Sequence, residues 1–440
     1  MPPSGPERNK LGLWTSTSLV VGNMVGSGIF LLPSALASYG GISLIGWICA
    51  AGGAFLMAKV FARLSVLVPQ ADGGPYAFSR AGFGDFAGFL VAWGYWISIW
   101  CTNAAIAVSL VSALSAFFPA LNGHPFTSAL TALAAIWTLT WVNTRGIRAS
   151  GSLQLLTTIL KLLPLVSVAL VGLFFIQAAH FRPFNLSGQS NFSAISSTAA
   201  MTLYAFLGLE CATIPAGSVI NPSRTIPKAT LIGTLFTSAI YILGTVSVLG
   251  AVDPKALQRS VTPFGDAAVR IWGPAARYWV SAGVAVAAFG ALNGWILIQG
   301  QIPYAIAKDK LFPRIFAREN KQGTPALGIV ISSVLVTVFT LMNYSRGLVQ
   351  QFRFLVLLST LTSLVPYLFS MAAFIVVCLQ QRAQVKINWP SSIVLSVLSF
   401  GFAFWAIAGA GQEIVYWGFL LLMAGVPLYV WVLRNRMQNP

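Results

Sequence analysis

One carboxyl group and one lysine ammonium lie inside long apolar segments of this sequence, where ionisable side chains are rare. Glu210 belongs to the stretch Met201–Thr213, and it is the only one of nine acidic residues placed deep in such a segment. Lys161 belongs to the stretch Thr157–Pro164. An ionisable group at the centre of a membrane helix costs about 2.5–3.5 kcal/mol on insertion scales, so its presence indicates function. The chemistry open to these groups is attraction of a cation by the carboxylate and proton transfer by the lysine.

Small residues interrupt the first apolar segment at Gly26-Ser27-Gly28. Glycine costs about 1 kcal/mol relative to alanine inside a helix, and backbone groups freed within hydrocarbon must find other partners. We therefore expect a break that lines a cavity. A half-helix that starts there points N–H groups and a positive dipole end into the cavity, which suits a carboxylate. The alternative is that Gly22 and Gly26 form a small-residue packing face against another helix.

A second interruption is predicted in segment six, where Gly208 precedes Glu210 by two residues. Interrupted helices at matching positions in two halves of a chain are typical of transporter sites at the membrane midplane. The alternative for Glu210 is a protonated carboxyl group that forms a hydrogen bond to a neighbouring helix.

The composition indicates a polytopic membrane protein, because 57% of the 440 residues are hydrophobic and only 8% are charged, against about 25% charged in soluble domains. The net charge of +17 is spread through short loops, so we expect a lipid bilayer and no nucleic acid as partner. The four cysteines lie in apolar segments without metal-binding spacing, so no metal or other cofactor is expected.

The fold class predicted from hydropathy is all-α, with 12 transmembrane helices in one domain over residues 1–440. Residues 12–177 and 193–380 form two sets of five helices, read as inverted repeats, and helices 11 and 12 follow at 389–433. Loops rich in Lys and Arg place both termini in the cytoplasm. We also expect a short interfacial helix at Tyr76–Arg80 and another helix in the outer loop Asp253–Gly273. The candidate segments cover approximately residues 12–36, 42–66, 86–116, 125–143, 153–177, 193–217, 226–251, 274–300, 325–343, 351–380, 389–410 and 413–433.

Several motifs together resemble the amino acid–polyamine–organocation superfamily of transporters, and most closely its basic amino acid/polyamine antiporters, such as arginine/agmatine and putrescine/ornithine exchangers. The resemblance runs nearly end to end. It implies a five-plus-five inverted repeat with helices 1 and 6 broken, a location in the cell (inner) membrane, and often a homodimer. The motifs are Gly22–Pro33 (GNMVGSGIFLLP), Asp72–Tyr76 (DGGPY), Thr202–Glu210 (TLYAFLGLE), Asn221–Ala229 (NPSRTIPKA), Thr262–Asp266 (TPFGD) and Val365–Tyr367 (VPY).

The resemblance also implies a set of site residues, which are substrate contacts in one group and gate or proton-coupling residues in another. The loop at Gly26, Ser27 and Gly28 would receive the substrate carboxylate, and the backbone around Ala205 and Leu207 the α-amino group. Tyr204 and Trp295 would supply aromatic faces, although ordinary packing is the alternative for both rings. The remaining residues are Asn103, Ser98 and Ser359 at the distal end of the substrate, with Ser98 departing from the arginine pattern, and Tyr95, Glu210 and Tyr367 in a gate layer.

Lys161 is a second departure, because the antiporters have an apolar residue at this position. It resembles the helix-five lysine of proton-coupled amino acid symporters in the same superfamily. A protonated lysine there would bridge helix five to the broken helix one. The alternative is a lysine whose stem lets the ammonium reach the cytoplasmic interface.

The sequence thus favours a secondary active transporter that moves cationic amino acids or polyamines by exchange or with protons. A proton-coupled symporter of neutral amino acids that uses Lys161 is the alternative. An enzyme is disfavoured, because the two histidines, His124 and His180, lie in separate loops and no nucleophile–base pair appears. A channel is disfavoured because no filter motif is visible.

Overall fold

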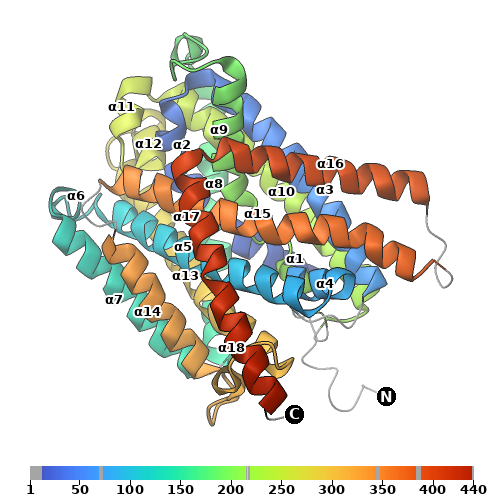
Figure 1. Cartoon of the computed structure of the whole chain (residues 1–440). Coiled ribbons are helices and arrows are strands. Elements are labelled where there is room, and N and C mark those ends of the chain that lie inside the picture. The colour runs from blue at the N-terminus through green and yellow to red at the C-terminus, as the bar shows by residue number, and fades with distance from the viewer. Residues whose placement is uncertain are drawn as a thin grey trace, which may run out of the picture.

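The computed structural model describes residues 12–68, 73–145, 147–214, 216, 219–342, 347–382 and 388–438. All regular elements of these residues are helical, and Figure 1 shows them packed as one bundle. The helices of the bundle are α1 (Leu13–Met24), α2 (Ser27–Ala37), α3 (Ser43–Leu67), α5 (Asp85–Leu114), α7 (Pro125–Thr144), α8 (Ile147–Val171), α9 (Asn191–Leu203), α10 (Pro222–Ala251), α13 (Ala276–Lys308), α14 (Ala326–Met342), α15 (Leu348–Gln380), α16 (Trp389–Gly409), α17 (Gln412–Met423) and α18 (Gly425–Gln438).

The length and apolar composition of these helices confirm a multi-pass, all-helical membrane protein. Within the described ranges, ten helical spans are long and apolar enough to cross a membrane, and Leu160–Phe175 and Ala326–Met342 are shorter apolar helices. The connecting elements are α4 (Pro75–Phe83), α6 (Ala120–Gly123), α11 (Pro254–Arg259), α12 (Pro263–Trp272), and the 3-10 turns η2 (Gly40–Ile42), η3 (Gly172–Phe175), η4 (Ala178–Phe181), η5 (Tyr204–Phe206), η6 (Cys211–Thr213) and η8 (Arg314–Ala317).

Two expectations about the loops are confirmed. The helix predicted at Tyr76–Arg80 lies within α4, and the loop Asp253–Gly273 carries α11 and α12. The interfacial and outer positions of these helices stay predictions. Asp72, the first residue of the motif Asp72–Tyr76, lies outside the described residues. The last predicted segment is divided, because α17 ends at Met423 and α18 begins at Gly425.

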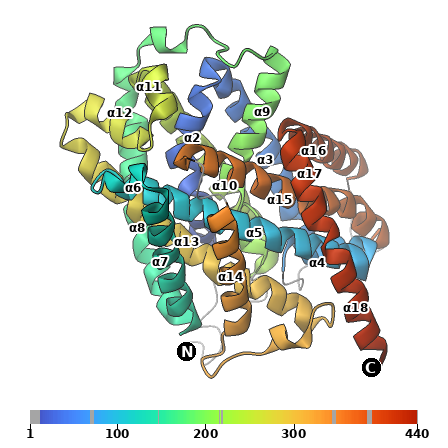
Figure 2. The same ribbon diagram turned by 60° about the vertical axis from the view of Figure 1, so that its left-hand side comes forward.

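The connecting elements gather at two opposite ends of the molecule. Figures 1 and 2 both place α11 and α12 at one end and α4 at the other. We call these the α11 end and the α4 end. Helix α5 runs through the middle, where it packs along both α13 and α15.

The first interruption lies at Val25 and Gly26, which separate α1 from α2. Val25 has φ −73° and ψ 77°, and Gly26 has φ −117° and ψ −143°, so neither continues the helix. A Cβ on Gly26 would lie 3.1 Å from Cβ of Ala291 on α13, which leaves little room for a larger residue. The expected loop at residues 26–28 is therefore shorter than predicted, because Ser27 and Gly28 already form the first turn of α2.

The second interruption begins where α9 ends at Leu203 and continues through η5 and η6. Between these turns Gly208 has φ +105°, a conformation that side chains disfavour because Cβ approaches the backbone. A Cβ on Gly208 would lie 3.2 Å from Cβ of Asn23 and 3.4 Å from the Met24 nitrogen. The two interrupted segments therefore touch each other inside the bundle.

This contact predicts that Gly208→Ala destabilises the protein more than an alanine at a glycine with similar backbone strain. Gly411 is the matched control, because its φ is +90° and nothing lies within 4 Å of a Cβ there. Both variants pay the left-handed strain, and only Gly208→Ala adds overpacking, which typically costs about 1–3 kcal/mol. We expect a lower apparent melting temperature in detergent for Gly208→Ala than for Gly411→Ala. Equal melting temperatures would contradict the close approach of the two segments.

Candidate functional site

Three consecutive carbonyl groups at the end of α1 accept hydrogen bonds from three other helices. Lys161 Nζ on α8 donates to the Gly22 oxygen. Trp295 Nε1 on α13 donates to the Asn23 oxygen at 3.3 Å, and Tyr241 Oη on α10 donates to the Met24 oxygen at 2.5 Å. The last carbonyls of a helix have no partner within the helix, and membrane interiors offer no water to replace one. Side chains of α8, α10 and α13 thus make the early end of α1 tolerable.

Lys161 is fully buried, and α8 begins at Ile147, so this lysine lies about 21 Å along the helix at 1.5 Å per residue. The Lys161 ammonium therefore does not extend to the end of the bundle, as the alternative for this lysine would require. The ammonium lies instead at the C-terminal end of α1, where the helix dipole favours a cation. The contact bridges helix five of the predicted order to the broken first helix.

Glu210 is a fully buried carboxyl group that receives three donors. Tyr95 Oη donates to Oε1 at 2.5 Å, and Tyr367 Oη donates to Oε2 at 2.5 Å. The backbone N–H of Gly208 donates to Oε2 at 3.3 Å. Tyr95 comes from α5 and Tyr367 from α15, so the carboxyl group joins the second interruption to both central helices. A charged acceptor strengthens each of these bonds.

The Glu210 layer faces the α4 end of the molecule. Thr213, in the same irregular segment, lies against Gly74, where a Cβ would be 2.6 Å from the threonine oxygen. The ring of Tyr367 also packs edge-on against the ring of Phe61, with centroids 5.2 Å apart. The residues that resemble a gate layer are therefore in contact with one another and lie between the interruptions and α4.

Aromatic and small apolar residues enclose the other side of the interruptions. Tyr204 is 5% exposed and meets Phe352 on α15 edge-on, with ring centroids 6.2 Å apart. Trp295 is 2% exposed, and Ala205 and Leu207 are buried. Access to the backbone between these residues therefore requires a movement of the surrounding helices.

The predicted distal contacts lie on α5 and α15. Asn103 Nδ2 donates to Gln299 Oε1 at 2.7 Å. Ser359 Oγ donates to the Ser98 carbonyl at 3.0 Å and lies 2.6 Å from the Thr102 hydroxyl. Ser98 itself donates to the Tyr95 carbonyl. The hydroxyl groups of Ser98 and Ser359 are thus occupied within the protein.

Three buried asparagine oxygens lack a donor among the described residues, namely Oδ1 of Asn23, Asn103 and Asn143. Asn23 lies beside the first interruption, and Asn103 is one of the predicted contacts. Both side chains are at most 3% exposed. A buried acceptor without a partner costs about 1–3 kcal/mol, so each oxygen favours a ligand that supplies an N–H group. Gly26, the N-cap of α2, has no side chain with which to cap the first N–H groups of that helix. Buried amide oxygens suit an ammonium, and free N–H groups at the start of a helix suit a carboxylate.

The structure brings some of the predicted residues together and adds others. Glu210 contacts Tyr95 and Tyr367, whereas Asn103 contacts Gln299 rather than another predicted residue. The side chain of Ser27 lies outside the described part of the chain. Sequence reasoning missed Tyr241, Gln299, Asn23 and Phe352. The only available signal for the first three was a polar group within an apolar segment.

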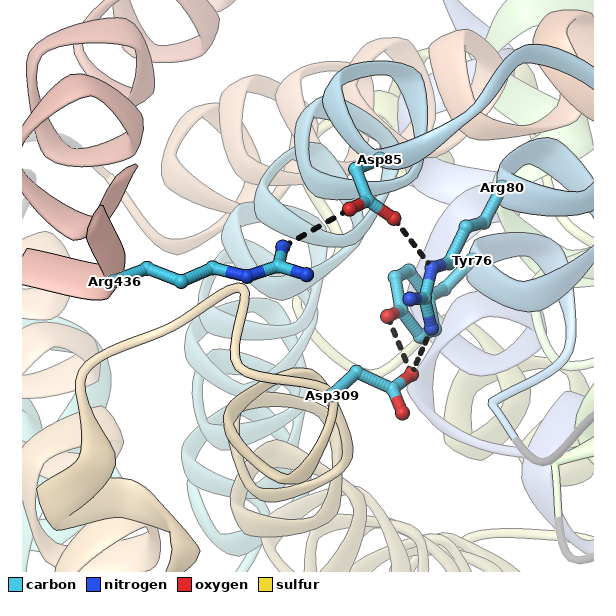
Figure 3. Close-up of polar contacts among 5 residues, drawn as sticks. All are labelled: Tyr76, Arg80, Asp85, Asp309 and Arg436. Atoms are coloured by element: carbon cyan, nitrogen blue, oxygen red, sulfur yellow. Dashed lines mark hydrogen bonds and ion pairs between the residues drawn. The ribbon is translucent and has the colours of Figure 1, made fainter. Parts of the chain in front are cut away.

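A separate polar cluster lies at the α4 end, as Figure 3 shows. Arg80 on α4 pairs with Asp85 at 2.8 Å and with Asp309 at 2.7 Å. Tyr76 Oη donates to Asp309 at 2.6 Å, and Arg436 on α18 pairs with Asp85 at 3.1 Å. Burial and then the hydrogen bond to Asp309 raise the pKa of the Tyr76 phenol well above its usual value. The cluster links α4 and α5 to the end of α13 and to α18.

A family model and several curated relatives match most of this chain. Residues 11–433 match the family model described as amino acid permease. A cadaverine/lysine antiporter of Escherichia coli (strain K12) is 35% identical, over 92% of this chain and 90% of the relative. A putative arginine/ornithine antiporter of Bacillus subtilis (strain 168) is 34% identical over 83% of each chain. The putrescine transporter PotE of Escherichia coli (strain K12) is 32% identical over 97% of each chain.

A solved structure shares the fold at low identity. The crystal structure of a manganese transporter from Eremococcus coleocola, in complex with an aromatic bis-isothiourea substituted compound, aligns with a TM-score of 0.62. The sequence identity is 14%, and the alignment covers 96% of this chain and 94% of that one. This likeness concerns the fold alone.

The hydrogen bond at the end of α1 predicts the effect of Tyr241→Phe. The variant removes the phenol donor and leaves the Met24 carbonyl only the Gly26 N–H at 2.7 Å, and the loss of one buried hydrogen bond costs about 0.5–1.5 kcal/mol. We expect a lower apparent melting temperature for the purified protein. Tyr416→Phe is the control, because Tyr416 is 60% exposed on α17 and its hydroxyl group should contribute little. If the two variants melt alike, the capping of α1 by α10 does not stabilise the fold.

Proposed function

This chain belongs to the amino acid permease family, and from that premise we propose that it is an antiporter that exchanges cationic amino acids and polyamines by alternating access. The family and the relatives are membrane transporters, and this chain is therefore a membrane transporter and not an enzyme. Three relatives are named for cadaverine and lysine, for arginine and ornithine, and for putrescine. All of these substrates carry at least one ammonium or guanidinium group in addition to any α-amino group.

The observation that carries the proposal is the meeting of two interrupted segments at buried, unpaired polar groups. The start of α2 offers N–H groups and a positive dipole end to a carboxylate. Asn23 Oδ1 and Asn103 Oδ1 are buried acceptors without donors in the described residues, which suits the ammonium groups of the substrate. The rings of Tyr204 and Trp295 would stabilise a cationic side chain by about 0.5–2 kcal/mol. Ser27, Gly28, Ala205, Leu207, Ser98 and Ser359 complete the proposed contacts.

The fold proposed for this cycle has 12 membrane helices. Helices α1 to α8 and α9 to α15 would form inverted repeats of five spans each, and α16 to α18 would supply the last two. The α4 end carries basic loop residues such as Arg80, Lys308 and Arg314, which supports a cytoplasmic position for that end and for both termini. We place the protein in the inner membrane. The exposed apolar side chains of α16 and α17 are compatible with a homodimer.

The transport cycle that we propose uses the two closed layers on either side of the interruptions. Opening toward the cytoplasm separates the Arg80 cluster and the layer of Tyr95, Glu210 and Tyr367, and opening toward the outside separates Tyr204 from Phe352. Exchange follows when only the substrate-loaded protein changes between these states. In this reading the Glu210 carboxylate holds two phenols together until the substrate or a proton competes for it.

The second candidate is a proton-coupled symporter of neutral amino acids, which the bond between Lys161 and the Gly22 carbonyl favours. Loss of the proton from this ammonium would weaken the bridge between α8 and α1. Proton binding would then alter the same helix end that borders the proposed substrate site. The two candidates differ in what drives uptake and in whether Lys161 must titrate.

Proteoliposomes distinguish these candidates. We expect labelled lysine, arginine or ornithine to accumulate faster in vesicles loaded with unlabelled substrate than in empty vesicles, without a pH gradient. Lys161→Gln keeps a donor for Gly22 but cannot exchange a proton, and we expect this exchange to survive in it. Labelled alanine under an imposed pH gradient is the comparison. Uptake of alanine that requires the gradient and is lost in Lys161→Gln would favour the symporter, and absence of any exchange would refute the antiporter.

The Arg80 cluster predicts a shift toward the cytoplasm-open state when it is broken. Arg80→Gln removes two ion pairs that are about one-third exposed, so stability should fall by less than about 1 kcal/mol for each pair. We expect faster alkylation of Cys211 in a variant whose other cysteines are replaced, because this buried thiol adjoins Glu210.

The measurement uses a membrane-impermeant maleimide applied from the cytoplasmic side. Arg318→Gln is the matched control, because Arg318 is an exposed arginine in the loop that follows α13. Equal alkylation rates in the two variants would show that the cluster does not hold this end closed.

A further inference from the structure

Arg353 is a cation at the α11 end whose observed partner is a neutral phenol. Its Nη2 donates to the Tyr39 hydroxyl at 2.6 Å, and the guanidinium carbon lies 5.5 Å from the centre of the same ring. Among the described residues it has no carboxylate partner, whereas Arg80, Arg277 and Arg436 each pair with an aspartate. A guanidinium has five N–H donors arranged to grip a carboxylate with two of them.

Arg353 also lies next to the residues that close the proposed site on this side. Its neighbour in the chain, Phe352, is fully buried and packs edge-on against Tyr204. Its partner Tyr39 follows α2, the helix whose first turn borders the interruption. Gln258 on α11 holds the end of α2 by donating to the Ala37 carbonyl at 3.2 Å. A substrate that enters between α2 and α15 from the α11 end must pass the guanidinium.

The acidic residues of the neighbouring α11–α12 loop do not neutralise this charge. Asp253 accepts from the N–H groups of Lys255 and Ala256 at the start of α11. Asp266 pairs with Arg277 at 2.7 Å and accepts from Ser260 at 2.5 Å. Because Arg353 is partly buried, solvent ions screen it less than a fully exposed arginine. The two aspartates of this loop are therefore engaged with groups other than Arg353.

We propose that Arg353 is a specificity-determining residue. Its guanidinium binds the α-carboxylate of an incoming amino acid, and its charge disfavours the corresponding diamine. Removal of the carboxylate turns a basic amino acid into a diamine that has two ammonium groups and nothing for the guanidinium to bind. Entry from the α11 end then favours the amino acid, while release of the diamine on that side is promoted. The inference rests on the proposed function, because it requires substrate to pass between α2 and α15.

The test compares L-lysine with cadaverine, which has the same carbon chain without the carboxylate. Both are measured as external substrates of oriented proteoliposomes. We expect Arg353→Gln to raise the KM for lysine about threefold to tenfold with little change in maximal rate, as loss of one partly screened charge contact does. The KM for cadaverine should stay constant or fall. Arg353→Lys should retain part of the discrimination, because it keeps the charge without the planar fork.

Two further variants separate charge from structure. Tyr39→Phe removes the hydrogen bond and keeps the guanidinium, and Arg259→Gln removes an exposed charge on α11. Both should keep the wild-type ratio of the two KM values. Equal changes for lysine and cadaverine in Arg353→Gln, or a Tyr39→Phe variant that reproduces its effect, would overturn the inference while leaving the antiporter intact. If the wild-type protein moves neither compound, the proposed function fails and this inference fails with it.

Discussion

Unpaired carbonyl groups at a helix end inside the bundle are the constraint on which the rest of this structure depends. Helix α1 ends at Met24, and side chains of Lys161, Trp295 and Tyr241 donate to its last three carbonyls, the last of which also accepts from the Gly26 N–H. The three donors come from α8, α13 and α10, so the break in one helix organises three others around it. The N–H groups at the start of α2 and the amide oxygens of Asn23 and Asn103 remain for a ligand.

The proposed transport function depends on closed layers on both sides of this arrangement. Toward the α4 end, Glu210 holds Tyr95 and Tyr367 together, and the Arg80 cluster joins four helices beyond that layer. Toward the α11 end, Tyr204 packs on Phe352. The layers consist of a few hydrogen bonds, ion pairs and ring contacts, each worth about 1–3 kcal/mol or less. A bound substrate can therefore supply enough free energy to exchange one closed layer for the other.

The sequence predicts the helices well, because a membrane span is set by length and hydropathy, which are local properties. It also locates the interruptions, since glycine weakens a helix wherever it stands. The first interruption falls at Val25 and Gly26 rather than over residues 26–28. The positions of the glycines show that the helix is weak in this region but do not determine at which residue it ends. The donors that decide this lie far along the chain, and no local pattern distinguishes Tyr241 from other polar residues of α10.

The residues of the candidate site were likewise predictable only in part. Family resemblance groups Tyr95, Glu210 and Tyr367, which the structure places in contact although the chain separates them widely. Gln299 and Phe352 were missed because their roles arise from packing between α5, α13 and α15. Arg353 falls within the predicted segment 351–380, and its position beside Tyr39 depends on how α2 meets α15.

Amide resonances of the two interrupted segments test most directly whether they form the substrate site. Carbonyl-labelled Met with nitrogen-labelled Val selects the single Met24–Val25 peptide, and Glu with Cys selects Glu210–Cys211. Cys with Leu selects Cys378–Leu379 near the end of α15 as the control. The account predicts that the amino acid exchanged fastest by proteoliposomes shifts the first two signals and leaves the third unchanged. Saturating binding of that amino acid with neither of the first two signals moved would contradict it.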